Sequence, residues 1–345
     1  PNLYPYIIHN PGEGIGAKRR SAAVLVDHLI PAMARADSYD DLMELDGNLQ
    51  EYFHAVNAKQ KDQASILLLR IHELVKNLSM MEEMGVAKDA TPEEISDHLN
   101  DLYDYISELK DALIRDGLHI MGKVPEGKRM VEMIYSLTRL QNGSTPSLRE
   151  ALAEAKGWDL HDLLGEPSEI HPEMGQLKGA LLDQVDEECH RLIEKMMDAE
   201  FRQEDCSEIV SVAYPDRNLR LLESTEFICD KVVPGIKGTV DEISNLMVGL
   251  AAGYVPPGPS GSPTRGNAHL LPTGRNFFTI DPDTIPSYAC WEVGRKMADQ
   301  MVDRHVKEMG CYPKNVGIVI WALDTMRTGG DDIAYILWLM GLRPR

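Results

Sequence analysis

Apolar residues recur at helical spacing along most of the chain between residues 38 and 252. The clearest helix start is Thr91-Pro92-Glu93-Glu94, which combines a hydroxyl cap, a proline at the first helical position and two acids in the first turn. We expect this helix to run along a heptad-like apolar seam and to end at Gly117. The pattern predicts two further helices within residues 38–85, and others over residues 127–140, 147–156, 175–200, 219–232 and 239–252.

The N-terminal stretch differs from this helical body. Tyr6-Ile7-Ile8 predicts a short buried strand, which leads through a glycine-containing turn into a helix from about Ala17 to Leu29. A strand, a glycine turn and a helix in this order outline an edge that can face a ligand.

The C-terminal third departs from the pattern in a different way. Proline and glycine are so dense between residues 254 and 287 that we expect neither a helix nor a central strand there. A loop of this length inside a compact chain is usually functional or disordered. A helix from Tyr288 to Glu308, a buried strand from Val316 to Ala322 and a helix from Asp331 to Met340 are predicted to follow it.

These elements predict a mainly α fold with an α/β portion at the C-terminal end and a short strand at the N-terminus. We expect a strand-turn-helix edge (1–35), a helical domain (36–253), a Pro/Gly-rich loop (254–287) and the start of a truncated α/β domain (288–345). Because the chain starts inside an apolar stretch and stops just after an amphipathic helix, we expect it to be a fragment of a larger multidomain subunit.

Composition narrows the class of protein. The 345 residues are 43% apolar and 26% charged, as in an ordinary globular protein. The net charge of −20 disfavours nucleic acid and anionic membranes and favours a cationic ligand or a basic partner. Five cysteines without a Cys-x-x-Cys pair argue against a disulfide framework or a structural zinc site and favour a reducing cytoplasm, and we expect no membrane span.

The first candidate site is the turn from Asn10 to Gly14, followed by Lys18, Arg19 and Arg20. Two flanking glycines allow the backbone to present the carboxylate of Glu13 at a strand-to-helix edge. The basic cluster opposes the dipole of a helix start unless it binds an anionic group. A plain turn with a solvated basic cluster is the alternative. The turn lacks the Gly-Lys-Ser/Thr ending of an ATP-binding Walker A loop.

Two further clusters carry acids or histidine. Asp116 and His119 follow a predicted helix end and form a candidate acid/base or metal-ligand pair, or else only a helix C-cap with polar neighbours. Arg327, Asp331 and Asp332 follow the predicted C-terminal strand, at the edge where open α/β sheets bind ligands. The two acids also suit the first turn of a helix.

The long loop carries the fourth candidate, which consists of Arg265, Arg275 and Asn276. Arginine binds carboxylates in a bidentate manner, so the loop predicts an anionic ligand group, with a surface linker as the alternative. Most histidines are isolated and His28 is ambiguous. The sequence contains no His-x-x-x-His pair, so we do not expect a closed metal cage.

Taken together, four blocks resemble one family. They are residues 4–14 with 17–20 and 26–29, residues 114–119, residues 254–261 with 263–266 and 271–277, and residues 326–334. In this order and spacing they look like the CobN-type cobaltochelatase and magnesium-chelatase H-subunit family, and the resemblance covers almost the whole chain. Gly12 and the Gly-Gly-Asp-Asp run side with the cobalt branch, whereas Ile15-Gly16, Ala32-Met33-Ala34 and Ala322-Leu323-Asp324 depart from the usual pattern.

The resemblance implies a large subunit that holds a tetrapyrrole and receives Co²⁺, with Mg²⁺ as the alternative metal. Separate AAA+ motor subunits, of the CobS/CobT or ChlI/ChlD type, would hydrolyse the ATP. The implied reaction is insertion of Co²⁺ into a corrin precursor of the hydrogenobyrinate diamide type in cobalamin biosynthesis, and the isolated fragment is expected to be inactive. Alternatives are a subunit that inserts Mg²⁺ into protoporphyrin, and a tetrapyrrole-binding or scaffold module without chemistry.

Within this resemblance the candidate residues take roles. Glu13 would take a ring proton or hand over the metal, and His119 is the second candidate base. The residues expected to hold the peripheral carboxylates of the ring are Lys18, Arg19, Arg20, Arg265, Arg275, Asn276 and Arg327. The residues expected to face the metal are Glu13, Asp116, His119, Asp331 and Asp332.

Overall fold

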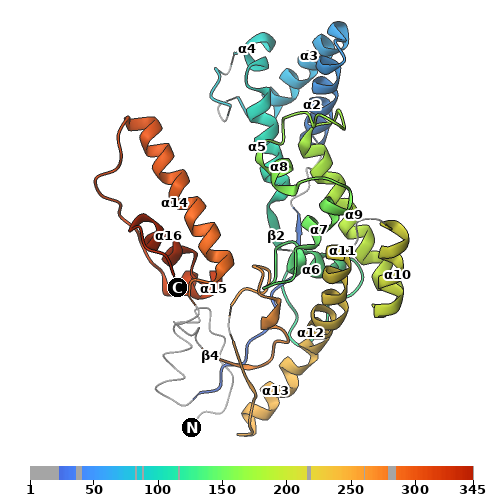
Figure 1. Ribbon diagram of the computed structural model, residues 1–345, viewed down its shortest axis with the longest axis vertical. Coiled ribbons are helices and arrows are strands. Elements are labelled where there is room, and N and C mark those ends of the chain that lie inside the picture. Colours follow the sequence, from blue (N-terminus) through green and yellow to red (C-terminus); the bar gives the residue numbers. More distant parts are fainter. Residues whose placement is uncertain are drawn as a thin grey trace.

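The structure is a computed structural model that describes residues 23–35, 41–81, 84–87, 89–115, 117–215, 219–259, 261–278 and 285–344. Figure 1 shows an elongated helical body with a smaller helical unit beside it, formed by the C-terminal segments. The first half contains β1 (Met33–Arg35), α2 (Asp41–Asn57), α3 (Lys61–Asn77), α4 (Pro92–Ser96), α5 (Leu99–Asp111), β2 (Leu113–Arg115), α6 (Lys128–Thr138), α7 (Leu148–Ala155) and α8 (Leu160–Gly165). The second half contains α9 (Lys178–Asp198), α10 (Gln203–Ala213), α11 (Leu219–Phe227), the π-helix η1 (Ile228–Val232), α12 (Val233–Lys237), the 3-10 turn η2 (Gly238–Val240), α13 (Asp241–Leu250), β3 (Pro257–Pro259), the 3-10 turn η3 (Ala268–Leu270), β4 (Asn276–Phe278), α14 (Tyr288–Met309), α15 (Ala322–Thr328) and α16 (Asp331–Leu339).

Two large hydrophobic cores, together with a small cluster of Leu163, Leu181 and Leu182, hold the described helical body together. One lies among α2, α3, α4 and α5, where Tyr103 and Ile106 are fully buried. The larger core joins α6, α7, α9, α10, α11, η1 and α12 around residues such as Tyr135 and Ile193. Burial of the apolar faces of these amphipathic helices supplies the main driving force for the fold.

Buried ion pairs tie these helices to one another. Lys110 on α5 bonds to Asp46 on α2 at 2.9 Å and also to Asp183 on α9. Arg149 on α7 is 4% exposed and bonds to Asp186 on α9 at 2.8 Å. A buried charge is tolerated only when it is paired, so these pairs fix which helices are neighbours.

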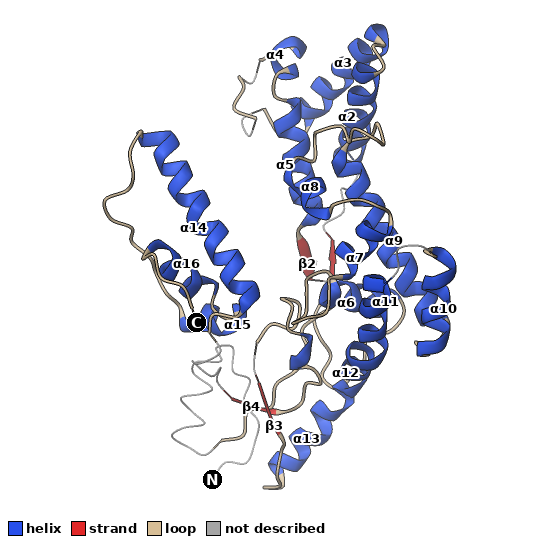
Figure 2. Cartoon of the chain, viewed as in Figure 1, coloured by secondary structure: helices blue, strands red, loops and turns tan. Residues whose placement is uncertain are grey.

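The strands are short and join distant segments. β1 pairs with β2 in an antiparallel manner, and β3 pairs with β4 in a parallel manner. Figure 2 shows the first pair between the helices of the body and the second pair at its lower end. Each of these four strands has three residues. For β3 and β4 this reflects the proline and glycine content of the loop that carries them.

The C-terminal unit consists of α14, α15 and α16. Gly294 of α14 lies against Ala334 of α16, and a Cβ built on this glycine would come within 2.6 Å of the Ala334 side chain and of the Asp331 carbonyl oxygen. The rings of Trp291 and Trp338 meet edge to face, with centroids 5.8 Å apart. The close crossing of these two helices therefore depends on the missing side chain of Gly294.

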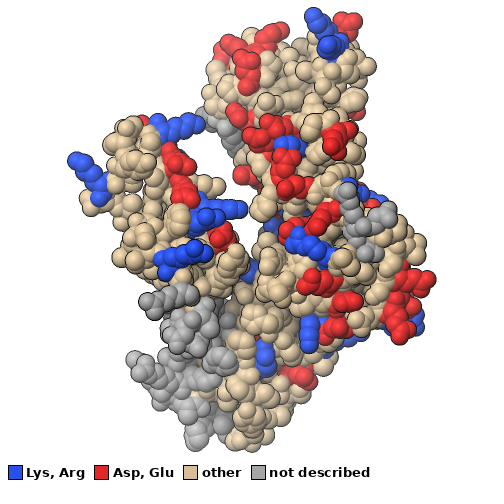
Figure 3. Space-filling view, viewed as in Figure 1, with Lys and Arg blue, Asp and Glu red and all other residues tan. Residues whose placement is uncertain are grey.

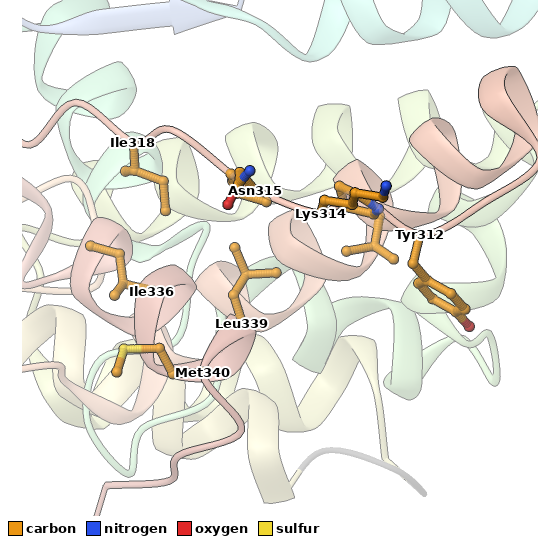
Figure 4. A pocket seen from close by; sticks show the side chains of 10 residues that line it. Tyr312, Lys314, Asn315, Ile318, Ile336, Leu339 and Met340 are labelled. Carbon is orange, nitrogen blue, oxygen red and sulfur yellow. The ribbon is translucent and has the colours of Figure 1, made fainter.

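A groove lies between the segment that follows α14 and the helices α14 and α16. The segment from Tyr312 to Ile318 crosses α14 and α16 and encloses about 440 Å³ together with Val302, Ile336, Leu339 and Met340. Figure 4 shows Ile318, Ile336 and Met340 at one end of the groove and Tyr312 at the other. Each helix in the described part of the chain is too short or too polar to span a lipid bilayer.

The mainly α prediction is confirmed, and most predicted helices form within a few residues of their expected ends. The predicted cap at Thr91 is also confirmed, because the Thr91 hydroxyl accepts from the Glu94 amide while the Glu94 carboxylate accepts from the Thr91 amide. The predicted strand over Tyr6–Ile8 lies outside the described residues.

Three local predictions are wrong. The helix expected to continue to Gly117 is split between α4 and α5 and ends at Asp111, because residues 113–115 pair with β1 instead. Residues 23–29 of the helix expected over 17–29 are not helical, because their backbone groups bond to the Pro/Gly-rich loop. The strand expected over 316–322 does not form: α15 begins at Ala322, and the described residues provide no neighbouring strand for this exposed segment.

We predict that Gly294→Val destabilises the C-terminal unit by about 1–3 kcal/mol, because the added side chain overpacks the crossing of α14 and α16. Urea denaturation followed by tryptophan fluorescence measures the change. Gly47→Ala in α2 is the matched control: nothing lies within 4 Å of its Cβ position, so it should be neutral or stabilise the helix by up to about 1 kcal/mol. Equal denaturation midpoints for Gly294→Val and the wild type would contradict this account of the crossing.

Candidate functional site

The segment after the N-terminal motif lies alongside the arginine-bearing part of the Pro/Gly-rich loop. The Asp27 amide donates to the Arg275 carbonyl at 3.1 Å, and the Gly274 amide donates to the Asp27 carbonyl at 3.1 Å. The Phe277 amide donates to the Leu25 carbonyl at 3.0 Å, and Val26 faces Asn276 in an antiparallel bridge. Two blocks that lie about 250 residues apart in the sequence therefore form one small ladder, in which residues 25–27 pair with β4 and the two residues before it.

Glu242 stands at the centre of the site. It lies in the first turn of α13, and its side chain is fully buried. Oε1 accepts from the Leu29 amide at 2.5 Å and from the Thr273 hydroxyl at 2.6 Å. Oε2 accepts from His119 Nε2 at 2.7 Å and from the Gly122 amide at 2.8 Å. A single carboxylate thus joins four segments that are far apart in the sequence.

These contacts decide the charge of Glu242. Burial works to raise its pKa, but the donors, led by His119 and Thr273, together hold the pKa below its usual value. The dipole at the start of α13 adds to the preference for a negative charge. Glu242 is therefore a buried carboxylate that stays ionised.

Two histidines extend this cluster toward the surface. His119 is almost buried, whereas His28 is exposed. Their rings are nearly parallel, with an interplanar angle of 6° and centroids 5.8 Å apart. His28 Nδ1 lies 2.8 Å from the Leu29 carbonyl oxygen. The order from solvent inward is His28, His119 and Glu242.

Asp27 and Arg275 form the other side of the site. The Asp27 carboxylate accepts from the Arg275 amide at 2.6 Å. Burial raises the pKa of Asp27 to about 6, with repulsion from Glu242 adding to the rise, while the amide and positive charge of Arg275 work against it. A carboxyl group with this pKa changes its charge close to neutral pH.

The described residues use only part of the hydrogen-bonding capacity of the Arg275 side chain. Nη2 donates to the Leu270 carbonyl at 2.5 Å, and the side chain lies against Gly258, where a Cβ would collide with Nε. Nε is buried and has no hydrogen-bond acceptor within the described residues. Gly258 therefore makes room for a guanidinium group whose bonding capacity is not exhausted.

The candidate residues of the C-terminal unit bond mainly to each other and to the loop. Arg265 bonds to Asp331 at 2.9 Å, and the Ser262 amide donates to the Arg327 carbonyl at 3.3 Å. The Arg327 guanidinium bonds to Asp324 at 2.8 Å, and the Asp332 carboxylate accepts from the Thr325 hydroxyl. The third and fourth sequence blocks are thereby in direct contact.

The structure therefore brings His119, Arg275 and Asn276 to one place, and places Arg265, Asp331, Asp332 and Arg327 together at the neighbouring contact. Glu13, Lys18, Arg19, Arg20 and Asp116 lie outside the described residues. Across the described ranges, no cluster of three or more His, Cys, Asp or Glu side chains has the geometry to hold a metal ion.

Sequence reasoning missed Glu242, Thr273 and Asp27 as site residues. The spacing of Thr239 and Glu242 matches a capping box, in which the acid would fold back onto its own helix start. In the structure the Thr239 hydroxyl is buried without a partner among the described residues, and Glu242 instead faces His119. No local signal distinguishes these two uses of the same pattern.

We predict that Asp27→Asn stabilises the protein at neutral pH, and that the gain disappears in acid. Since the folded-state pKa of Asp27 is about 6 and the unfolded value is 3.8, the folded state binds more protons between these values and stability falls as pH rises through them. The ionised group then costs about 3 kcal/mol.

Chemical denaturation at pH 4, 5, 6 and 7 measures this effect. The unfolding free energy of Asp27→Asn relative to the wild type should rise across that series. Asp198→Asn, at an exposed position, is the control and should show no such slope. A variant less stable than the wild type at pH 7 would show that the charge of Asp27 is needed for the fold.

Comparison with known proteins places the chain in a family. The CobN/Magnesium Chelatase family profile matches residues 1–345. The aerobic cobaltochelatase subunit CobN of a Sinorhizobium species is 32% identical over 364 residues, which cover all of this chain and 28% of that protein. The H subunit of the magnesium chelatase of Chlorobaculum parvum is 28% identical over 351 residues, which cover all of this chain and 27% of that protein.

A solved structure agrees with these relatives. The catalytic subunit of cobaltochelatase from Mycobacterium tuberculosis superposes with a TM-score of 0.81 and 33% identity, over 99% of this chain and 28% of that one. The chain thus spans little more than a quarter of the length of these relatives. Because the family profile covers every residue, the chain belongs to the CobN/magnesium-chelatase family.

Proposed function

We propose that this chain is the tetrapyrrole- and metal-facing segment of the large subunit of an ATP-dependent chelatase that inserts Co²⁺ into a corrin precursor of the hydrogenobyrinate diamide type. Family membership supports a chelatase subunit. The cobalt assignment rests on Gly12, on the Gly-Gly-Asp-Asp run and on the 32–33% identity to relatives named as cobaltochelatase subunits. Insertion of Mg²⁺ into a porphyrin is the alternative that metal competition would reveal.

The observation that carries this proposal is the meeting of distant motifs at one place. Leu29, His119 and Thr273 belong to three of the four family blocks, and all three donate to Glu242. Through Arg265 and Asp331 the fourth block is bonded to the third. Ionisable groups with shifted pKa values that are gathered from separate motifs are typical of functional sites, which favours this proposal over a helical scaffold alone.

Insertion of a metal ion into the macrocycle requires only a few protein side chains. Two protons must leave the ring nitrogens, water must leave the ion, and the ring must be held in place. We assign proton removal or metal handover to Glu13, with His119 as the second base. Asp116, Asp331 and Asp332 would face the metal. Arg275, with spare bonding capacity beside Gly258, would hold a peripheral carboxylate of the ring.

Other basic residues would complete the hold on the ring. Lys18, Arg19 and Arg20 follow the Glu13 turn, and Arg265 and Arg327 mark the contact with the C-terminal unit. Figure 3 shows an open cleft between that unit and the helical body, with acidic side chains gathered over the upper part of the body. In this proposal AAA+ motor subunits of the CobS/CobT or ChlI/ChlD type hydrolyse ATP in the cytoplasm and drive a conformational cycle of the large subunit.

The first test is Glu13→Gln in the complete subunit, assayed with its motor subunits. We expect metal insertion to fall by about 10²-fold or more, the usual contribution of a positioned acid or base, while affinity for the macrocycle is kept. Glu200→Gln, at an exposed position, is the control. Unchanged insertion in Glu13→Gln would favour a scaffold or carrier role without chemistry.

The second test concerns ring binding by Arg275. Arg275→Gln should weaken binding of a cobalt-free corrin or a porphyrin by about 10- to 100-fold, since a hydrogen bond between charged groups is worth about 1.5–3 kcal/mol. Titration followed by the visible absorbance shift of the macrocycle measures the change. Arg304→Gln is the matched control, because Arg304 is 81% exposed and bonds to Glu308 within its own helix. Equal affinity in both variants would remove Arg275 from the binding site, and no absorbance shift with the wild type would contradict tetrapyrrole binding itself.

A further inference from the structure

A buried, ionised carboxylate holds the ring of His119 from behind. His119 Nε2 lies 2.7 Å from Glu242 Oε2. An ionised carboxylate can only accept a hydrogen bond, so Nε2 must carry the proton. In the neutral imidazole the lone pair then sits on Nδ1, the nitrogen that does not face Glu242.

The surroundings leave Glu242 little freedom to do anything else. Its Oε2 also accepts from the Gly122 amide, and its Oε1 is held by the Leu29 amide and the Thr273 hydroxyl. These two backbone amides and one hydroxyl group all donate to the carboxylate. They therefore hold it in position and favour its ionised form. Among the four donors in this described cluster, His119 is the one whose donating group is an imidazole, which can carry its proton on either of two nitrogens.

We propose that Glu242 is a positioning residue that fixes His119 as the Nε2–H tautomer, so that His119 Nδ1 accepts a proton from a pyrrole nitrogen of the macrocycle. This inference rests on the proposed function and assigns a group that sequence reasoning did not single out. Carboxylates that orient a histidine from behind serve this purpose in other proton-transfer sites and in metal sites.

The step balances without any further reagent. A ring N–H bond breaks, a new N–H bond forms at His119 Nδ1, and the electron pair stays on the ring nitrogen, where it bonds to the incoming divalent ion. The resulting imidazolium carries a positive charge beside the negative charge of Glu242, which stabilises it in a poorly solvated place. The proton then leaves to water.

His28 has a place in this arrangement. Its ring covers one side of His119 with an interplanar angle of 6°, and its own Nδ1 faces the Leu29 carbonyl, which can only accept. His28 Nδ1 must therefore carry a proton, so in the neutral ring of His28 the lone pair lies on Nε2. The exposed His28 thus shields His119 on one side without competing for Glu242.

The first readout is the tautomer itself, measured on the 345-residue chain by NMR after ¹⁵N labelling of histidine, at a pH where the ring is neutral. We expect His119 to show the Nε2–H form. In Glu242→Gln the single amide oxygen can satisfy only one of the two donor pairs, so the Nε2–H form should no longer be the sole form. Thr273→Val removes a different donor from the same carboxylate and should leave the tautomer unchanged, which controls for general loosening of the site. The Nδ1–H form in the wild type would overturn the proposal.

The second readout is the reaction of the complete subunit with its motor subunits. We expect Glu242→Gln to lower kcat by about 10²-fold or more with little change in the KM for the macrocycle, and to alter the pH profile of kcat in the same way as His119→Gln. Unchanged kcat together with an altered tautomer would refute the role of Glu242 in the reaction. Full insertion activity in His119→Gln would refute His119 as a base while leaving the chelatase assignment intact, so the two failures are distinguishable.

Discussion

The structure depends on how one buried negative charge is satisfied. A carboxylate that is removed from water without partners costs several kcal/mol, and each of the four donors to Glu242 reduces that cost. The donors are Leu29, His119, Gly122 and Thr273. His119 and Gly122 lie on one loop, and the other two donors lie far from it and from each other in the sequence. Satisfying this single group therefore fixes the relative positions of the N-terminal segment, the loop after β2, α13 and the Pro/Gly-rich loop.

The sequence predicted the helical body well because helical amphipathicity is a local property. The cap at Thr91, the long helix α9 and the helix α14 follow from spacing and from residues within one turn of their ends. The ends that failed are those decided by partners far away in the sequence. Residues 113–115 form a strand because they pair with residues 33–35. The sequence of neither segment alone predicts this pairing.

The site shows the same division. Arg275 and His119 stand in distinctive glycine- and proline-bearing motifs, so sequence alone marked them as candidates. The structure places both beside the segment that follows the N-terminal motif, Arg275 against Asp27 and His119 against His28. Glu242 stands in an ordinary helix start, where an acid is expected for reasons of the helix dipole alone. Its use as an acceptor for His119 depends on the tertiary fold. The contact between Arg265 and Asp331, both candidates on charge grounds, likewise could not be read from either motif separately.

Under the proposed function, a site for metal insertion would not need a closed set of metal ligands. The macrocycle supplies four nitrogens, and a protein that bound the ion with several strong ligands of its own would compete with the product. What the protein must supply is a base of defined orientation, a hold on the ring and a local charge that tolerates a passing proton. Within the described ranges, His119 and Arg275 stand within one hydrogen-bonded cluster around Glu242 and Asp27. The short ladder between residues 25–27 and 274–277 bonds the loop that carries Arg275 to the segment that carries His28, so a movement of one segment must also move the other; under the proposed function this would couple ring recognition to proton transfer.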